Sequence, residues 1–364
     1  MKKGIVLVVL VLVSFSLIMT GCKKKEGAAG PENKILRLLT WSGYAPDVLI
    51  EKFEAETGYT VEVTYTSNEE MISKLRATRG GGYDLAEPSF DRVPAVTAEY
   101  GIYQPIDYSR VDLDQIEPNM LEAVKTTTMV DGKSYGVPHV SGTNGMIVNK
   151  ALAPDVKDFK DLLDLKYEGR ISYRMKRPVI IAMGYALGYT PIEDYNDKVK
   201  YQEFLDGVEK ALIAAKPAVR NYWDNGDALV ESMRSGEVWA AMAWEQQGAR
   251  LYKENPDIDY LAAESGVIGW IDCFALPSKS ENLDAAYAWI NFSLRPENAA
   301  VLTNSVNYMT ASKDASQYYE AEAKANFERW FPPEVLAKIH WHQAVPAGIE
   351  EMEGKTMDRI RAAK

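Results

Sequence analysis

Aromatic and acidic side chains stand at several positions where the sequence predicts loops next to strands. A flexible aliphatic cation suits such a set, because aromatic faces pack against its methylene groups and attract its charge by about 0.5–2 kcal/mol each, while carboxylates bind its ammonium ends. Taken singly, each aromatic residue is more simply explained as part of a hydrophobic core. Taken together, they predict a site for a small amine. The residues of this predicted amine site are Trp41, Tyr44, Ser89, Asp91, Trp244, Glu245, Trp270, Asp272 and Tyr308.

Motifs of catalytic sites are missing from the sequence. It has no Gly-x-Ser-x-Gly elbow, no Walker-type loop, no His-Glu-x-x-His and no Gly-x-Gly-x-x-Gly after a strand. Ser89, His139 and an aspartate could be drawn as a hydrolytic triad, but any chain of this length contains such residues. The run of glycines at residues 80–82 is more typical of a helix end than of a phosphate site. Three scattered histidines and two cysteines do not form a metal-binding cluster. We therefore expect no catalytic residue, metal or cofactor.

Residues 35–90 are predicted to form two strand–loop–helix units and a third strand. Residues 35–39 are an apolar run of strand length, residues 59–65 alternate apolar and polar positions, and residues 83–86 follow a glycine-rich break. Open α/β sheets bind ligands at the carboxyl ends of their strands. The loops at residues 40–46 and 88–91 should therefore meet at one edge of the sheet, where they carry part of the predicted amine site.

The chain beyond its first 34 residues is too long for one hydrophobic core, which rarely serves more than about 250–300 residues. Strands alternate with helices between residues 153 and 266, which predicts a second parallel-rich sheet. Small and polar residues 141–145 interrupt two strands and suit a crossover between lobes. We predict an α/β fold with two discontinuous lobes, each a mixed sheet flanked by helices. The predicted lobes are residues 35–142 plus 271–310, and residues 143–270 plus 311–364.

The N-terminus has the pattern of a secretion signal. Lys2 and Lys3 precede an apolar run at residues 5–19, and Cys22 follows at the expected cleavage point. This pattern resembles a bacterial lipoprotein signal, in which Cys22 would become the diacylated first residue. An ordinary secretory signal with an incidental cysteine is the alternative. Residues 22–34 are charged and rich in small residues, which predicts a flexible tether.

Charge and cysteine content narrow the possible partners. The formal net charge is −11, which argues against nucleic acid and anionic lipid as partners. If Cys22 carries lipid, Cys273 has no cysteine left to pair with. Its apolar neighbours predict a buried strand thiol that acts as a small apolar residue.

Several spaced motifs resemble those of the periplasmic spermidine/putrescine-binding proteins, the substrate receptors of ABC polyamine importers. The matches cover nearly the whole chain after the tether. They are Thr-Trp-Ser-Gly-Tyr at 40–44, Phe-Glu-Ala-Glu-Thr-Gly at 53–58, Ser-Asn-Glu-Glu at 67–70, Asp-Leu-Ala-Glu-Pro-Ser at 84–89, Gly-Trp-Ile-Asp at 269–272 and Leu-Arg-Pro-Glu at 294–297.

This resemblance implies a type II-like periplasmic-binding-protein fold with a hinge between its lobes. It also implies a monomeric receptor that is not an enzyme, held by lipid at the outer face of the cytoplasmic membrane or in the periplasmic space, with permease and ATPase subunits as partners. Asp272 would bind an ammonium group of a putrescine-like or spermidine-like ligand. The residues implied to line the cleft are Trp41, Tyr44, Ser89, Trp244, Trp270, Asp272 and Tyr308.

The sequence departs from the family pattern in the second lobe. Polyamine receptors carry a pair of carboxylates where this chain has Arg174, Lys176 and Arg177. These positive side chains could point to solvent, with Asp91 or Glu245 supplying the second anchor for an amine. Alternatively, the ligand could carry an anionic group, such as a carboxylate.

Two further alternatives stay open at this stage. His139 stands near the position where the family has an aromatic residue, and it could be structural or lie at the rim of the cleft. A lipid-tethered secreted hydrolase is the alternative function from another class.

Overall fold

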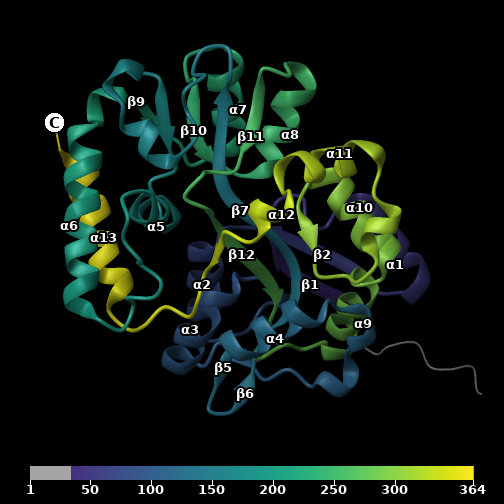
Figure 1. Ribbon diagram of the computed structural model, residues 1–364. Coiled ribbons are helices and arrows are strands. Elements are labelled where there is room, and N and C mark those ends of the chain that lie inside the picture. Colours follow the sequence, from purple (N-terminus) through teal and green to yellow (C-terminus); the bar gives the residue numbers. More distant parts are fainter. Residues whose placement is uncertain (1–33, 364) are drawn as a thin grey trace, which may run out of the picture. The chain divides into compact units, whose positions relative to one another are not determined.

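The computed structural model describes residues 34–363 (Figure 1). The predicted signal peptide, the lipidation site Cys22 and most of the predicted tether lie outside these residues. The strands are β1 (Ile35–Thr40), β2 (Thr60–Tyr65), β3 (Leu85–Ala86), β4 (Tyr103–Gln104), β5 (Met129–Val130), β6 (Lys133–Ser134), β7 (Val137–Asn149), β8 (Ile171–Tyr173), β9 (Val219–Tyr222), β10 (Ala240–Ala243), β11 (Ile258–Leu261), β12 (Val267–Phe274), β13 (Leu276–Pro277), β14 (Met309–Thr310) and β15 (Ile339–Trp341). The helices are α1 (Asp47–Thr57), α2 (Asn68–Ala77), α3 (Val93–Tyr100), α4 (Pro118–Thr127), α5 (Arg177–Ala186), α6 (Lys198–Ala214), α7 (Gly226–Arg234), α8 (Glu245–Glu254), α9 (Leu283–Ser293), α10 (Pro296–Val306), α11 (Ala321–Trp330), α12 (Pro333–Leu336) and α13 (Ile349–Ala362).

The first sheet confirms the two predicted strand–loop–helix units. Its order is β2-β1-β3, and β1 pairs in parallel with both neighbours. Helix α1 ends at Gly58, whose φ of 75° is the left-handed conformation that glycine adopts without strain. Helix α2 begins with a capping box between Ser67 and Glu70. Because β1 and β3 are parallel neighbours, the loops that follow them lie at the same edge of the sheet.

The second sheet has the order β15-β12-β7-β10-β8-β9, and β11 and β14 also pair with β7. Figure 1 shows β7 as one long strand, so the predicted break at residues 141–145 is wrong. Residues 140–144 pair with β12 throughout, which satisfies their backbone. Gly142 and Gly145 are needed there because a Cβ atom would collide with the rings of Trp270 and Tyr260, respectively. The two glycines, which in the sequence indicate a loop, are thus explained by the close packing of aromatic rings against the strand.

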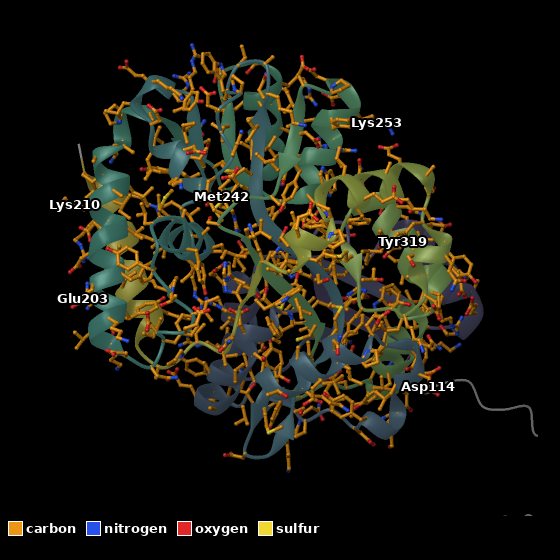
Figure 2. The ribbon with its side chains drawn as sticks, in the orientation of Figure 1. Asp114, Glu203, Lys210, Met242, Lys253 and Tyr319 are labelled. Carbon is orange, nitrogen blue, oxygen red and sulfur yellow. The ribbon has the colours of Figure 1, made fainter. Side chains whose placement is uncertain are left out.

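Two large hydrophobic clusters underlie these sheets. One joins β1, α1 and α9 through residues such as Leu38, Phe53 and Trp289. The other joins β7, β8, α5 and α6, with Met242 of β10 among its buried side chains. Figure 2 shows Met242 surrounded by other side chains, whereas Glu203 and Lys210 of α6 lie at the outer side of the molecule. Two cores of this kind agree with two lobes, although the residue boundaries of the lobes stay a prediction.

The C-terminal segment packs against more than one element. Strand β15 pairs with β12, and α13 packs against α6 and α5. Earlier in the segment, residues 315–318 pack against α10, and Ala311 belongs to the hydrophobic cluster of Leu38 and Phe53. Within residues 34–363, no helix combines the length and the apolar character needed to cross a membrane.

Candidate functional site

Asp272 on β12 is the centre of the candidate site. Its carboxylate accepts a hydrogen bond of 2.7 Å from the Tyr44 hydroxyl and one of 2.6 Å from the Ser89 hydroxyl. Tyr44 lies in the loop after β1, and Ser89 lies in the loop after β3. The parallel pairing of β1 and β3 brings these loops together, as the sequence predicted, and β12 supplies the acid between them.

Ser89 is itself held in place by Asn68, the first residue of α2. The Asn68 amide donates to the Ser89 hydroxyl at 2.8 Å, and the Ser89 backbone N–H donates to the Asn68 side-chain oxygen at 3.0 Å. Sequence reasoning did not place Asn68 in the site. The available signal was its position inside the capping box, because the start of α2 must then lie near the edge of the sheet.

Burial makes Asp272 an unusual acid. Its side chain is only 3% exposed, and this desolvation raises the pKa to about 7, although the hydrogen bonds from Ser89 and Tyr44 act in the opposite direction. Glu87 and Asp91 raise the pKa further through charge repulsion. A cation placed next to this buried acid would stabilise its ionised form, so the site favours a positively charged ligand.

An aromatic cluster adjoins Asp272. The rings of Tyr44 and Tyr308 have centroids 6.5 Å apart, and Trp270 meets Tyr308 edge to face at 5.0 Å. Trp41 and Trp244 are partly buried and pack against the same cluster. The structure thus brings together all five predicted aromatic residues. Such a group offers flat apolar walls to methylene groups and electron-rich faces to a cation.

Glu245, the first residue of α8, is a second buried acid. It is 1% exposed, and its Oε1 atom accepts hydrogen bonds from the backbone N–H and hydroxyl of Thr143, at 2.6 and 2.8 Å. Desolvation raises its pKa to about 8. Glu245 thus contacts β7 at Thr143, whereas Asp272 is paired with Val140 of the same strand.

Two polar atoms near the aromatic cluster lack partners. The Trp270 indole nitrogen Nε1 and the Glu245 oxygen Oε2 are buried, and neither has a hydrogen-bond partner in the part of the chain that the structure describes. Buried polar atoms are nearly always paired in folded proteins. These two atoms are therefore candidates for direct contact with a ligand.

Asp91 is placed differently from the rest of the predicted set. Its carboxylate accepts a hydrogen bond from Arg177 at 2.8 Å, and Arg177 also pairs with Glu353 at 3.1 Å. The hydroxyl of Tyr201 donates to Glu353 at 2.6 Å, and Tyr195 contacts Arg177. Asp91 is thus already satisfied within the protein, and its role as a ligand residue stays a prediction.

The alternative in which the positive side chains at residues 174–177 point to solvent does not hold for Arg174 and Arg177. Arg177 is only 7% exposed and lies in the network with Asp91. Arg174 lies over the ring of Trp244, with 4.8 Å between its Cζ atom and the ring centroid. Each guanidinium group has a partner within the protein: Arg174 stacks on an aromatic ring, and Arg177 pairs with two acids.

His139 has a structural environment. Its ring is buried, stacks on Phe274 with centroids 4.1 Å apart, and has Nδ1 3.2 Å from the Glu87 carboxylate. Ser89, by contrast, donates its hydroxyl to Asp272. Ser89 and His139 thus contact different acids, which does not favour the hydrolytic triad that the sequence allowed. Cys273 is fully buried, as predicted, and desolvation raises the pKa of its thiol well above the usual value.

Comparison with known proteins places the chain among receptors for solutes. The spermidine/putrescine-binding periplasmic protein of Escherichia coli (strain K12) is 28% identical over 328 residues, which cover 88% of this chain and 90% of that protein. The putrescine-binding periplasmic protein PotF of the same strain is 27% identical over 363 residues, covering 93% and 94%.

A solved structure described as a putative spermidine/putrescine ABC transporter from Listeria monocytogenes has the same fold. Its TM-score is 0.77 at 24% identity, and the match covers 91% of this chain and all of that one. The predicted two-lobed α/β fold is thereby confirmed. A family model described as bacterial extracellular solute-binding protein matches residues 48–329. Because this match spans well over half of the sequence, the chain belongs to the bacterial extracellular solute-binding protein family.

Proposed function

We propose that the protein captures a small aliphatic amine, such as a polyamine of the putrescine or spermidine type, and delivers it to the permease of an ABC importer. The observation that carries this proposal is the buried Asp272 carboxylate, held by Tyr44 and Ser89 beside the aromatic cluster. The names of the relatives from Escherichia coli, which are receptors for spermidine and putrescine, support the same ligand class. In this proposal no covalent bond is made or broken.

Binding follows from the geometry of the site. An ammonium group would take the place next to the Asp272 carboxylate, and its charge would favour the ionised form of that acid. The methylene groups would lie against the rings of Trp270 and Tyr308. Trp41 is fixed as part of the same wall, because its indole N–H donates to the Glu87 carbonyl oxygen at 2.9 Å. Closure of the two lobes around the ligand would then exclude water.

The proposed location follows from the N-terminal sequence. Cleavage before Cys22 and attachment of lipid to this residue would hold a monomeric receptor at the outer face of the cytoplasmic membrane. Residues 22–34 would act as a tether that keeps the receptor close to the permease. The negative net charge of −11 fits the attraction of a cationic ligand over a distance.

Calorimetry and thermal unfolding of the protein with putrescine and spermidine test this function directly. A ligand present at about 100 times its Kd should add about 2.7 kcal/mol to the free energy of unfolding. We expect saturable binding of one amine per chain, with the amine recovered unchanged. The proposal is wrong if neither amine binds. Chemical change of the ligand would instead support the secreted hydrolase.

Amine affinity should depend strongly on pH through Asp272. Its pKa in the free protein is about 7, whereas an unfolded aspartate titrates near ~3.9. The raised pKa contributes stability to the free protein below pH ~4, and this contribution is lost as the pH rises through about 7. Amine binding has the opposite dependence, because it needs the carboxylate ionised. Affinity should therefore be about 100-fold weaker at pH ~5 than at pH ~8, at up to tenfold for each pH unit.

Isothermal titration at several pH values, in buffers with different ionisation enthalpies, measures both the affinity and the protons released. Glu245→Gln is the matched control, because it removes the other buried acid while leaving Asp272 in place. The control should keep the steep dependence below pH ~7. An affinity that stays flat across this range would show that Asp272 is not the group that meets the ammonium.

A further inference from the structure

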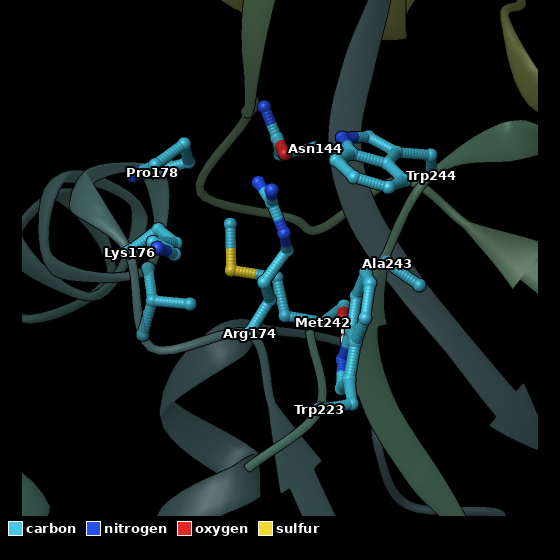
Figure 3. A pocket seen from close by; sticks show the side chains of 9 residues that line it. Asn144, Arg174, Lys176, Pro178, Trp223, Met242, Ala243 and Trp244 are labelled. Carbon is cyan, nitrogen blue, oxygen red and sulfur yellow. Dashed lines mark hydrogen bonds between the residues drawn. The ribbon is translucent and has the colours of Figure 1, made fainter. Parts of the chain in front are cut away.

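Arg174, the residue after β8, is held between two tryptophan rings. Its guanidinium carbon lies 4.8 Å from the ring centroid of Trp244 and 5.9 Å from that of Trp223. The two indoles meet edge to face at 5.3 Å, and Trp223 is anchored because its N–H donates to the Met242 carbonyl oxygen at 3.1 Å. Figure 3 shows the guanidinium pointing into a pocket, toward the side chain of Asn144. The two tryptophan rings thus fix the direction in which the Arg174 guanidinium points.

The charge of Arg174 is not neutralised inside the protein. Its Nε atom is buried and has no hydrogen-bond partner among residues 34–363, and Arg174 forms none of the ion pairs found there. Burial lowers the pKa of this guanidinium, and the acids that act against this shift, Glu69 and Asp224, do so only as more distant charges. Arg177, by contrast, has two acids in direct contact. A partly buried guanidinium without an acid is suited to an anionic ligand, to which it can donate charge-assisted hydrogen bonds.

The other walls of the pocket also suit an anion. Helix α5 begins at Arg177, and its N-cap residue Lys176 makes no side-chain cap, so its positive N-terminal end faces this side of the pocket. Pro178 has no N–H and the Val179 N–H donates to the Lys176 carbonyl oxygen, which leaves the Arg177 N–H as the donor of this helix end. The Asn144 amide, whose hydrogen bond to the Ile268 carbonyl oxygen is long at 3.4 Å, can donate as well. None of the pocket-lining residues is an acid. The pocket volume of about 10 Å³ is room for one water-sized group, which fits a carboxylate oxygen better than a tetrahedral phosphate or sulfate.

The pocket and the Asp272 end of the site share one aromatic wall. Trp244 lines the pocket and also packs against the cluster of Trp270 and Tyr308. Burial is the largest cause of the raised pKa of Tyr308, the charges of Glu245 and Asp272 raise this pKa further, and the charge of Arg174 lowers it. Both Asp272 and Arg174 therefore lie within electrostatic reach of the Tyr308 hydroxyl. The acid Asp272 and the guanidinium of Arg174 therefore adjoin the same aromatic wall.

We propose that the ligand carries a carboxylate at the end opposite its ammonium group, so that Arg174 binds the carboxylate while Asp272 binds the amine. The ligand class is an aliphatic amino acid with its two charges separated by methylene groups. This inference rests on the proposed function as an amine receptor and specifies the other end of the ligand. A diamine in the same position would bring its second ammonium close to an unpaired guanidinium, and like charges at this distance repel.

A matched ligand series tests the inference by calorimetry on the whole protein. Cadaverine, δ-aminovalerate and the corresponding amino alcohol share one carbon chain and differ only in the group opposite the amine. We expect δ-aminovalerate to bind at least tenfold more tightly than the amino alcohol, and cadaverine to bind most weakly. Putrescine and γ-aminobutyrate repeat the comparison for a chain one methylene shorter.

Arg174→Met assigns the effect to this side chain, because methionine keeps apolar contact with the two indoles but removes the charge. The variant should bind δ-aminovalerate about 10-fold to 100-fold more weakly, while its affinity for cadaverine should be unchanged or higher. Arg174→Lys keeps the charge but not the planar guanidinium, so its affinity for δ-aminovalerate should lie between those of the natural protein and Arg174→Met. It replaces Arg174→Met in the test if that variant unfolds. Arg220→Met, at an exposed position paired with Glu237, is the control and should change neither affinity.

The outcomes separate the inference from the function on which it rests. If cadaverine binds to the natural protein as tightly as δ-aminovalerate or more tightly, the carboxylate assignment is overturned while the amine receptor stands. If valerate, which has no amine, binds as well as δ-aminovalerate, the proposed function itself is wrong. Loss of δ-aminovalerate affinity in Arg174→Met but not in Arg220→Met supports the assignment.

Discussion

Replacing Asp272 with asparagine is expected to weaken amine binding by roughly 30-fold to several thousand-fold while leaving the protein folded. This range corresponds to the loss of about 2–5 kcal/mol when one partner of a buried charge pair is removed. The side chain keeps its shape, and its remaining oxygen can still accept the hydrogen bond of Tyr44. At pH ~8 the variant should be at least as stable as the natural protein, because it no longer buries an ionised carboxylate.

Calorimetry of amine binding and denaturant unfolding, carried out at one pH, measure the two expectations separately. Asp284→Asn is the matched control, since Asp284 is exposed and pairs with Arg110 at the surface. It should change amine affinity by less than twofold. An Asp272→Asn protein with unchanged affinity would remove Asp272 from the site. A variant that loses stability as severely as affinity would show that this acid supports the fold instead.

Replacing Arg177 with methionine is expected to lower the free energy of unfolding by about 3–5 kcal/mol. The cause is that Asp91 and Glu353 lose their common partner and become unpaired acids inside the protein. The pKa of Glu353 is already raised by burial, and Arg177 is the charge that acts most strongly against this rise. Denaturant unfolding at neutral pH measures the loss.

The control for this experiment is Arg220→Met, because an exposed ion pair is worth only about 0–1 kcal/mol. The double variant Arg177→Met with Asp91→Asn should recover part of the lost stability, since it removes one of the two stranded charges. A loss below about 1 kcal/mol in Arg177→Met would contradict this prediction, because it would show that Asp91 and Glu353 are not left as unpaired charges when Arg177 is removed. A loss of amine affinity in Asp91→Asn alone would return Asp91 to the ligand site.

The first sheet and the loops that carry Tyr44 and Ser89 could be predicted because their signals are local. Strand length, the glycine after α1 and the capping box of α2 fix three neighbouring elements within residues 35–90. The loops at their ends then have to meet. Tyr44 and Ser89 were therefore found from the sequence and from its motifs.

The features that could not be predicted depend on contacts between distant parts of the chain. The pair of Asp91 and Arg177 joins residues 86 positions apart, and no periodic pattern encodes such a partner. The continuity of β7 was missed for a related reason. Gly142, Asn144 and Gly145 have a low local preference for a strand interior, and only pairing with β12 and β10 makes them part of a strand. Trp223 was missed because a single tryptophan after a strand gives no hint of the arginine that stacks on it.

The unbroken strand β7 also has a mechanical consequence. Val137 at its beginning packs in the cluster of Leu38 and Phe53, whereas Met146 and Val148 near its end pack in the cluster of α5 and α6. Any opening of the predicted lobes must therefore bend the ribbon of β7 and β12, whose ladder runs through the middle of the site. A paired ribbon resists bending elastically, whereas a loop hinge would swing freely. We expect the two lobes of this receptor to open by a small angle only. The elastic resistance of the paired strands should return them to one preferred conformation.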